Sequence, residues 1–240
     1  RRQRQMCIRD SNGLEKIASW RPDLIDGDFA ILMEPTDGRV EGGCQGTMRF
    51  TLEVPGRAAH SARSWVGHNA IHDLSAVLER LNRWQERDPF VEVDGLTFRE
   101  GLNATMLDAG VAGNVIPPTA TIQINYRFAP DKTTEQARQY MEDLFHEWPM
   151  NVLDLSAPAR PGLDRPLAKS FVAAVGGEPG PKYGWTDVAR FGQLGIPAVN
   201  FGPGNALCAH QVDECCRLGS LDECYRALHT LSLIHISEPT

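Results

Sequence analysis

Alternation of hydrophobic and polar residues predicts the secondary structure of the middle of the chain. The alternation runs through 47–54 and again through 119–128, which indicates two half-buried strands. In the second strand every other residue from Ile122 to Phe128 is apolar. Apolar residues recur at three- and four-residue spacing along 69–84, which predicts an amphipathic helix.

Further elements extend this pattern into a module. We expect strands at 102–109 and 151–155, and a helix that starts at the capping box Thr133-Thr134-Glu135-Gln136 and ends near Phe145. The order from 47 to 155 is then β-α-β-β-α-β, the split, ferredoxin-like arrangement.

The flanking segments read as pieces of an α/β domain. A short apolar run at 29–33 predicts a buried strand followed by a turn. After residue 157 the expected elements are a helix at 166–175, a helix capped by Thr186 and ending near Leu194, a strand at 196–201, and a last helix capped by Ser220-Leu221-Asp222-Glu223. We therefore predict an α/β protein in which a lid domain, 45–155, is inserted between two parts, 12–44 and 156–230, of a partial catalytic domain.

The two ends of the sequence have an unusual relationship. Met6-Cys7-Ile8-Arg9-Asp10-Ser11 and 231–237 can be encoded by DNA strings that are reverse complements of each other. Such an inverted repeat resembles the ends of a sequencing-library transposon. We therefore expect 1–11 and 231–240 to be scars and leave them out of the fold prediction.

Composition narrows the class of protein. The chain has 240 residues, of which 42% are hydrophobic. It contains 24 basic and 31 acidic residues, which gives a net charge of −7. This balance argues against binding to nucleic acid or to an anionic membrane. No apolar run reaches the roughly 18 residues that a membrane span needs. The six cysteines have no framework spacing, so we expect reduced thiols in a cytoplasmic protein.

Two residues are candidates for metal chemistry. Glu34 follows a buried strand, and carboxylates at the carboxyl ends of parallel strands line ligand crevices. His210 follows the Gly-Pro-Gly loop at 202–204, where it could ligate a metal. An alternative is a Cys₃His zinc site formed by Cys208, His210, Cys215 and Cys216. Adjacent cysteines chelate poorly, so small buried thiols are the better interpretation.

The remaining candidates each have an ordinary structural explanation. His60 fits a surface loop, Arg127 an exposed ion pair, Asn114 a turn and Thr186 a helix cap. No nucleophile elbow, Walker loop or dinucleotide fingerprint is present in the sequence.

Taken together, the candidate segments resemble the M20 family of metal-dependent peptidases and amidohydrolases. The motifs that carry the resemblance, in the order of the family, are Met33-Glu34-Pro35-Thr36-Asp37-Gly38, Gly56 with His60-Ser61, Gly67 and Asn69-Ala70-Ile71, Gly113-Asn114-Val115-Ile116-Pro117, Asn125-Tyr126-Arg127-Phe128, Trp185-Thr186-Asp187 with Arg190-Phe191, and Asn200-Phe201-Gly202-Pro203-Gly204 with His210 and Asp213-Glu214. The block at 57–65 leans toward family members that cleave N-succinyl amides; N-acetyl amides are the alternative.

The resemblance implies a catalytic domain with two zinc ions, for which cobalt could substitute, and an inserted lid that forms a homodimer. It assigns Glu34 to one metal and His210 to the other. It assigns His60 to a lid histidine that stabilises the amide oxyanion in the partner subunit's site, with Asn114 nearby.

The same resemblance assigns the substrate contacts. Arg127 matches an arginine that holds a carboxylate of a small N-acyl amino acid. Thr186 and Gly204 match positions that line the substrate pocket.

The chain also departs from the family pattern. The family's His-x-Asp motif, its bridging aspartate and its Glu-Glu pair all precede the position of Asn12, so we expect the chain as written to be inactive and to bind zinc poorly. A further alternative is a dimerisation module that does no catalysis.

Overall fold

The structure is a computed structural model that describes residues 13–208, 212 and 214–236. It is a mixed α/β structure, which confirms the predicted fold class. Its contacts divide the chain into two compact units. Unit 1 contains the described residues of Arg1–Cys44, Val93–Leu96 and Ala159–Thr240, and unit 2 contains Gln45–Glu92 and Thr97–Pro158.

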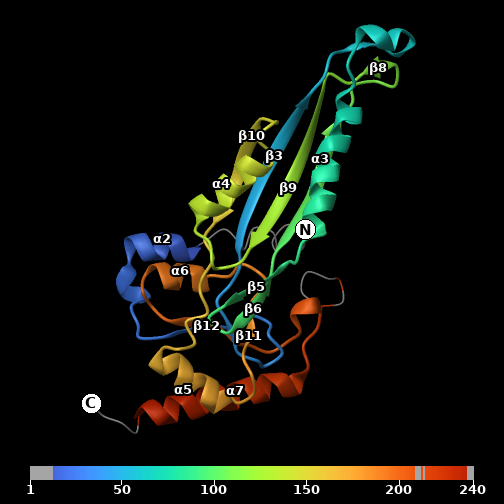
Figure 1. The fold of residues 1–240 in the computed structure, drawn as a ribbon. Coiled ribbons are helices and arrows are strands. Elements are labelled where there is room, and N and C mark those ends of the chain that lie inside the picture. Colours follow the sequence, from blue (N-terminus) through green and yellow to red (C-terminus); the bar gives the residue numbers. More distant parts are fainter. Residues whose placement is uncertain (1–12, 209–211, 213, 237–240) are drawn as a thin grey trace. The chain divides into compact units, whose positions relative to one another are not determined.

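Unit 2 is built on an antiparallel sheet with the strand order β10-β3-β9-β7 (Figure 1). The strands are β3 (Gly46–Pro55), β7 (Gly101–Ala109), β9 (Thr119–Phe128) and β10 (Met150–Ser156), and the helices are α3 (Ala70–Gln85) and α4 (Thr134–Leu144). These long elements follow the predicted order along the chain.

Side-chain alternation explains the core of unit 2. The apolar faces of β3 and β9 pack against both helices, so that residues such as Phe50, Ile124 and Met141 are completely buried. Asn69 caps α3, and Thr133 and Gln136 form the predicted capping box of α4. The other face of the sheet carries the polar positions of the same strands.

The apolar stripe of α3 is narrower than the sequence predicts. Residues Ala70, Leu74, Val77, Leu81 and Trp84 are buried. Ile71 and Leu78, which the prediction placed on the same stripe, are exposed. They flank the buried stripe and leave an apolar edge on the outer side of the helix.

An arm extends from unit 2, and we define it as residues 56–69 and 110–116. It contains β4 (Ala59–His60), the 3₁₀ helix η2 (Ser61–Val66) and β8 (Val115–Ile116). None of its residues is buried. The arm leaves the sheet where β3 ends at Pro55 and β9 begins at Thr119 (Figure 1).

A short hairpin of β5 (Phe90–Val93) and β6 (Leu96–Arg99) was not predicted. Its two turn residues, Asp94 and Gly95, have φ values of 49° and 79°. Both positive values are typical of a type I′ turn, for which Asp-Gly is a favoured sequence.

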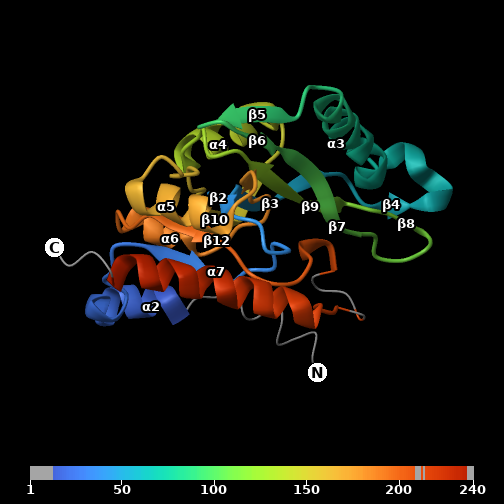
Figure 2. The same cartoon turned by 90° about the horizontal axis from the view of Figure 1, so that it is seen from below.

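Unit 1 contains a second sheet in the order β1-β12-β2-β11. Its strands are β1 (Ala30–Leu32), β2 (Glu41–Gly42), β11 (Gly180–Pro181) and β12 (Ala198–Asn200), and its helices are α2 (Gly13–Trp20), α5 (Pro166–Val175), α6 (Val188–Gln193) and α7 (Leu218–Ile236), with the 3₁₀ turns η1 (Pro22–Leu24) and η3 (Ala206–Cys208). Helices α5 and α7 pack side by side (Figure 2). Phe171, Val199 and Phe201 form the centre of this core.

Two predicted caps in unit 1 are wrong. Thr186 does not cap α6, because the helix begins after Asp187 and no side chain makes a capping bond there. Ser220 lies inside α7, where its hydroxyl donates to the carbonyl of Arg217 at 2.8 Å. No helix of the described residues has the length and apolar character that crossing a membrane demands.

Candidate functional site

In unit 1 the Glu34 turn lies beside the loop after β12. Strands β1 and β12 are parallel, with Leu32 opposite Asn200, so the segments that follow them leave the sheet at the same edge. The amide of Gly202 donates to the Thr36 hydroxyl at 3.1 Å, and the amide of Thr36 donates back to the Gly202 carbonyl at 3.3 Å. Two motifs that lie about 170 residues apart in the sequence are therefore joined at a strand edge of the kind where α/β proteins bind ligands.

The approach of these two loops depends on glycine. A Cβ atom on Gly202 would lie 2.5 Å from the carbonyl oxygen of Glu34 and 3.0 Å from the carbonyl carbon of Met33. Gly204 has a φ of 87°, and its carbonyl accepts a hydrogen bond from the amide of Asp37 at 2.7 Å. The predicted residues Glu34 and Gly204 thus belong to one compact pair of loops.

A lysine beneath the Glu34 turn was missed by the sequence analysis. The ammonium of Lys182 lies 2.9 Å from a carboxylate oxygen of Glu41 and donates to the carbonyl of Pro35 at 3.4 Å. The Lys182 side chain is almost completely buried. Because Pro35 follows Glu34 directly, this ion pair supports the backbone that carries the candidate ligand.

Thr186 is buried inside unit 1. Its carbonyl accepts a hydrogen bond from the thiol of Cys44 at 3.6 Å, and its hydroxyl oxygen has no hydrogen-bond partner among the described residues. Burial raises the pKa of the Cys44 thiol, which keeps it protonated and able to donate. The threonine expected to line a substrate pocket therefore has its side chain in the interior of the described structure.

The metal site predicted by the resemblance is represented here by Glu34 alone. His210, the other predicted ligand and a member of the alternative Cys₃His site, lies outside the described residues. Among residues 13–208, 212 and 214–236, no group of three or more His, Cys, Asp or Glu side chains could hold a metal ion. The described side chains do not form a metal site by themselves.

In unit 2 the arm brings His60 and Asn114 together. Strands β4 and β8 are antiparallel, with His60 opposite Val115, and the amide of Ser61 donates to the carbonyl of Asn114 at 2.9 Å. Both predicted residues are exposed. The imidazole Nδ1 of His60 accepts a hydrogen bond from the amide of Ala62 at 3.1 Å and so caps η2.

The base of the arm is closed by backbone contacts. Arg57 and His68 exchange two hydrogen bonds of 2.8 and 2.9 Å between their amides and carbonyls. A Cβ on Gly56 would lie within 2.9 Å of three backbone atoms, those of His68, Ala70 and Pro117. The end of β3, the arm and the start of α3 thus meet at Gly56, where there is no room for a side chain.

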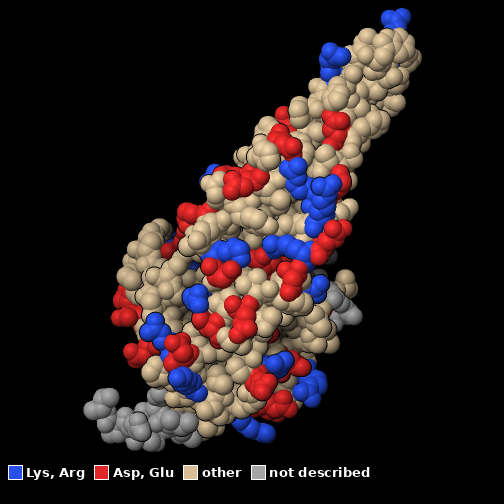
Figure 3. Space-filling model, viewed as in Figure 1, with Lys and Arg blue, Asp and Glu red and all other residues tan. Residues whose placement is uncertain are grey.

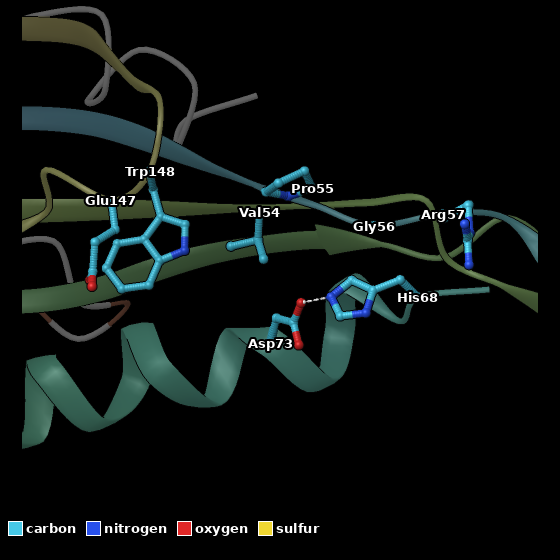
Figure 4. A pocket seen from close by; sticks show the side chains of 8 residues that line it. All are labelled: Val54, Pro55, Gly56, Arg57, His68, Asp73, Glu147 and Trp148. Atoms are coloured by element: carbon cyan, nitrogen blue, oxygen red, sulfur yellow. Dashed lines mark hydrogen bonds and ion pairs between the residues drawn. The ribbon is translucent and has the colours of Figure 1, made fainter. Parts of the chain in front are cut away.

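An open cavity of about 450 Å³ lies beside this base (Figure 4). Its lining consists of Val54, Pro55, Gly56, Arg57, His68, Asp73, Glu147 and Trp148. The imidazole of His68 pairs with the carboxylate of Asp73 in the first turn of α3. None of the predicted site residues lines this cavity, and we assign no reaction to it.

Arg127 lies at the other end of β9 from the arm. Its guanidinium donates to the side-chain oxygen of Asn125 at 3.0 Å on the polar face of the sheet. Since Arg127 is eight residues from Thr119, where the arm joins the strand, the two ends are separated by about 27 Å. One chain therefore does not bring His60 and Arg127 together.

Comparison with known proteins supports the family assignment. Residues 43–147 match the M20 peptidase dimerisation domain. Over 213 residues the chain is 52% identical to a Mycobacterium tuberculosis protein provisionally named succinyl-diaminopimelate desuccinylase DapE, with 88% of this chain and 60% of that protein covered. It is 41% identical to the succinyl-diaminopimelate desuccinylase of Corynebacterium glutamicum, with 85% of this chain and 57% of that protein covered. The chain thus spans about 60% of the length of these relatives.

Solved structures show the same fold. A tripeptidase from Staphylococcus aureus superposes with a TM-score of 0.68 at 20% identity, covering 93% of this chain and 61% of the other. An M20 family metallo-carboxypeptidase from Sulfolobus solfataricus superposes with a TM-score of 0.65 at 17% identity, covering 91% and 65%. The chain thus contains a segment that matches the M20 peptidase dimerisation domain, is similar over most of its length to these two bacterial proteins, and has the fold of these solved structures.

Proposed function

We propose that the protein to which this chain belongs hydrolyses the amide of N-succinyl-LL-2,6-diaminopimelate to succinate and LL-diaminopimelate, a step toward lysine and cell-wall precursors. The observation that carries the proposal is the 52% identity over 213 residues to the M. tuberculosis relative. Two fungal proteins named as probable carboxypeptidases, from Ajellomyces capsulatus and Aspergillus flavus, are 29% and 30% identical to the chain. The chain alone, which contains neither the general base nor most of the metal ligands expected from the resemblance, is proposed to be inactive.

In this proposal His60 stabilises charge on the substrate. An exposed imidazole at the end of an arm can donate a hydrogen bond to the amide oxygen as negative charge develops on it. Because His60 lies on the arm, which joins the end of β9 opposite to Arg127, we propose that the arm serves the site of the partner subunit. Asn114 lies beside His60 and is proposed to approach the same oxygen.

Arg127 is proposed to bind a carboxylate of the substrate. Its planar guanidinium can form two parallel hydrogen bonds with a carboxylate, which suits a substrate with several acidic groups. Asn125, which accepts a hydrogen bond from the Arg127 Nε, holds the guanidinium in one orientation. Glu34 and His210 remain the proposed metal ligands, with zinc as the proposed ion, and Thr186 and Gly204 remain proposed pocket residues.

A homodimer through unit 2 is the proposed assembly. Strand β7 is at the edge of the sheet, and Met106 and Leu107 on it are exposed. Ile71 and Leu78 add an exposed apolar edge on α3. An exposed edge strand with apolar side chains favours pairing with another strand, and a second copy would supply one. Light scattering of the chain should give the dimer mass, and Met106→Lys should shift it toward monomer; a wild-type monomer would refute this assembly.

The activity is tested by grafting the chain. We would replace the matching segment of the M. tuberculosis relative with residues 12–230 of this chain and measure release of succinate and of acetate from N-succinyl-diaminopimelate and N-acetylornithine. We expect turnover of the succinyl substrate, a loss of about 10²–10³ in kcat for His60→Ala, and mainly a rise in KM for Arg127→Ala.

Other outcomes of the graft separate the alternatives. Preference for N-acetylornithine would overturn the substrate and favour a deacetylase. A folded, dimeric graft that hydrolyses neither amide would instead favour a dimerisation module without catalysis. The unmodified relative, assayed in parallel, shows that both assays work.

A further inference from the structure

The contact between His60 and Ala62 determines which imidazole nitrogen carries the proton. A backbone amide can only donate a hydrogen bond, and the amide of Ala62 donates to Nδ1 of His60 at 3.1 Å. Nδ1 must therefore offer its lone pair. In the neutral imidazole the proton is then on Nε2, which becomes a hydrogen-bond donor.

The arm is built to keep this contact. Ala62 is the second residue of η2, and the amides of a first helical turn have no acceptor within the helix. The His60 side chain fills that role as the N-cap. The backbone of His60 is in turn fixed by its pairing with Val115 in β8.

We propose that the Ala62 amide is a positioning group that holds His60 as the neutral Nε2–H tautomer, so that the arm presents a hydrogen-bond donor to an oxygen of the substrate. His60 in this form acts neither as a base nor as a metal ligand through Nδ1. That the oxygen belongs to the amide of an N-acyl amino acid rests on the proposed function; the tautomer itself does not.

The charge of the arm favours an anionic acceptor. Arg57 and Arg63 are its only charged residues, so residues 56–69 and 110–116 contain no acidic side chain. Figure 3 shows Lys and Arg, and no Asp or Glu, at the tip of the arm on the visible face. An arm with two guanidinium groups and no carboxylate favours an oxygen that carries or develops negative charge.

The first experiment measures the tautomer in the chain as it stands. Two-bond ¹⁵N–¹H NMR spectra distinguish Nε2–H from Nδ1–H, at a pH about two units above the ordinary imidazole pKa of about 6.5. His72 provides the reference, since its ring has no hydrogen-bond partner in the part of the chain that the structure describes. His146 provides the opposite control, because its Nδ1 lies 2.9 Å from the carbonyl of Asp143 and must donate to it.

We expect His60 to favour Nε2–H over Nδ1–H about five-fold more strongly than His72 does, the ratio that one net hydrogen bond produces. His146 should show the Nδ1–H form. The His60→Gln variant assigns the His60 signals. A His60 ratio equal to that of His72, or a predominant Nδ1–H form, would overturn the proposal.

The second experiment connects the tautomer with activity in the grafted enzyme. The amide nitrogen of glutamine reaches about as far as imidazole Nε2, and that of asparagine about as far as Nδ1. We therefore expect His60→Gln to keep about ten-fold more kcat than His60→Asn, with similar KM values. Equal losses, or better function of the asparagine variant, would contradict donation from Nε2.

The two experiments fail in different ways. If the NMR result holds and the unmutated graft is inactive, the proposed function fails while the tautomer assignment stands. If the graft is active and His60 shows no enrichment of Nε2–H, the positioning role of Ala62 fails while the proposed function stands.

Discussion

The body and the arm of unit 2 are stabilised in different ways. In the body, aromatic and aliphatic side chains such as Phe50, Ile124 and Phe145 are completely buried, and Phe50 packs against Phe145 with ring centroids 5.8 Å apart. In the arm no residue is buried, and its shape depends on backbone hydrogen bonds and on close approaches at glycine. Burial thus determines the fold of the body, whereas local geometry determines where the arm presents His60.

The body also contains a buried carboxylate that has no counterpart in the arm. Glu100 accepts hydrogen bonds from the amide of Ala129 at 3.0 Å, the phenol of Tyr126 at 3.2 Å and the ammonium of Lys132 at 3.1 Å. The guanidinium of Arg87 pairs with its other oxygen at 2.5 Å. The pair formed by His68, at the base of the arm, with Asp73 is exposed and contributes little to stability.

The largest expected effect separates the two regions directly. Phe50→Ala removes a completely buried ring from the core, so we expect the free energy of unfolding to fall by about 4 kcal/mol. The matched control is Trp65→Ala in the arm, where the residue is 76% exposed and the change should stay within about 0.5 kcal/mol. Urea denaturation monitored by circular dichroism measures both, and equal losses would remove the distinction.

The next effect tests the buried carboxylate. Glu100→Gln keeps the size of the side chain and removes its charge, which leaves Arg87 without its counter-ion and Lys132 paired with Asp131 alone. We expect a loss of about 3 kcal/mol. Glu142→Gln, in an exposed pair with Arg138, should cost about 0.5 kcal/mol or less in the same denaturation experiment; a similar loss in both variants would show that Glu100 has no special role.

A smaller effect is expected at the base of the arm. Gly56→Ala places a methyl group against three backbone atoms that cannot move independently, so we expect a loss of about 2 kcal/mol. Hydrogen exchange should quicken at the amides of Arg57 and His68, which close the arm. Gly113→Ala is the control in the same arm, since no atom lies within 4 Å of its added Cβ; unchanged exchange in both variants would contradict the crossing at Gly56.

The smallest effect concerns alkaline pH. Burial, together with the nearby Glu100 carboxylate, raises the pKa of Tyr126 far above the ordinary value of about 10. As the pH rises, the unfolded chain therefore loses the phenol proton of Tyr126 before the folded chain does. The contribution of Tyr126 to the free energy of unfolding is complete below about pH 10 and is lost as the pH rises further.

Tyr126→Phe should cost about 1 kcal/mol at neutral pH, through the lost hydrogen bond to Glu100. The free energy of unfolding of the Tyr126→Phe variant should decline less steeply above about pH 10 than that of the wild type. Some decline should remain: burial lowers the pKa of Lys132, but hydrogen bonds to Asp131 and the charge of Glu100 outweigh it and raise that pKa overall. Parallel pH profiles would show that Tyr126 does not couple to alkaline unfolding.

The sequence predicted the long elements of the body because their periods reflect burial. Alternation in β3 and β9 and the three- and four-residue spacing in α3 record which side chains face the core. Two-residue strands such as β2 and β8 have no period to detect. The β5–β6 hairpin could have been found, since Asp94-Gly95 is a strong turn signal between two short runs.

The candidate site was predictable in part. Motif order identified His60 and Asn114 as candidates, and the arm places them side by side. It also identified Glu34 and Gly204, which lie on the two loops that are hydrogen-bonded to each other in unit 1. The role of the Ala62 amide was not predictable, because a backbone donor leaves no trace in residue identity. The burial of Lys182 under the Glu34 turn was not predictable either, since it depends on contacts between distant segments.

The contact at Gly202 separates two properties of this strand edge in unit 1: the spacing of its loops and the side chains around them. Main-chain atoms and the Thr36 hydroxyl set the spacing between the turn after β1 and the loop after β12, because nothing larger than hydrogen fits at Gly202. Neighbouring side chains such as Met33, which is exposed, can then vary without widening or narrowing that gap. Substitutions at such positions can thereby alter the surface of this edge while the frame that holds Glu34 keeps its dimensions.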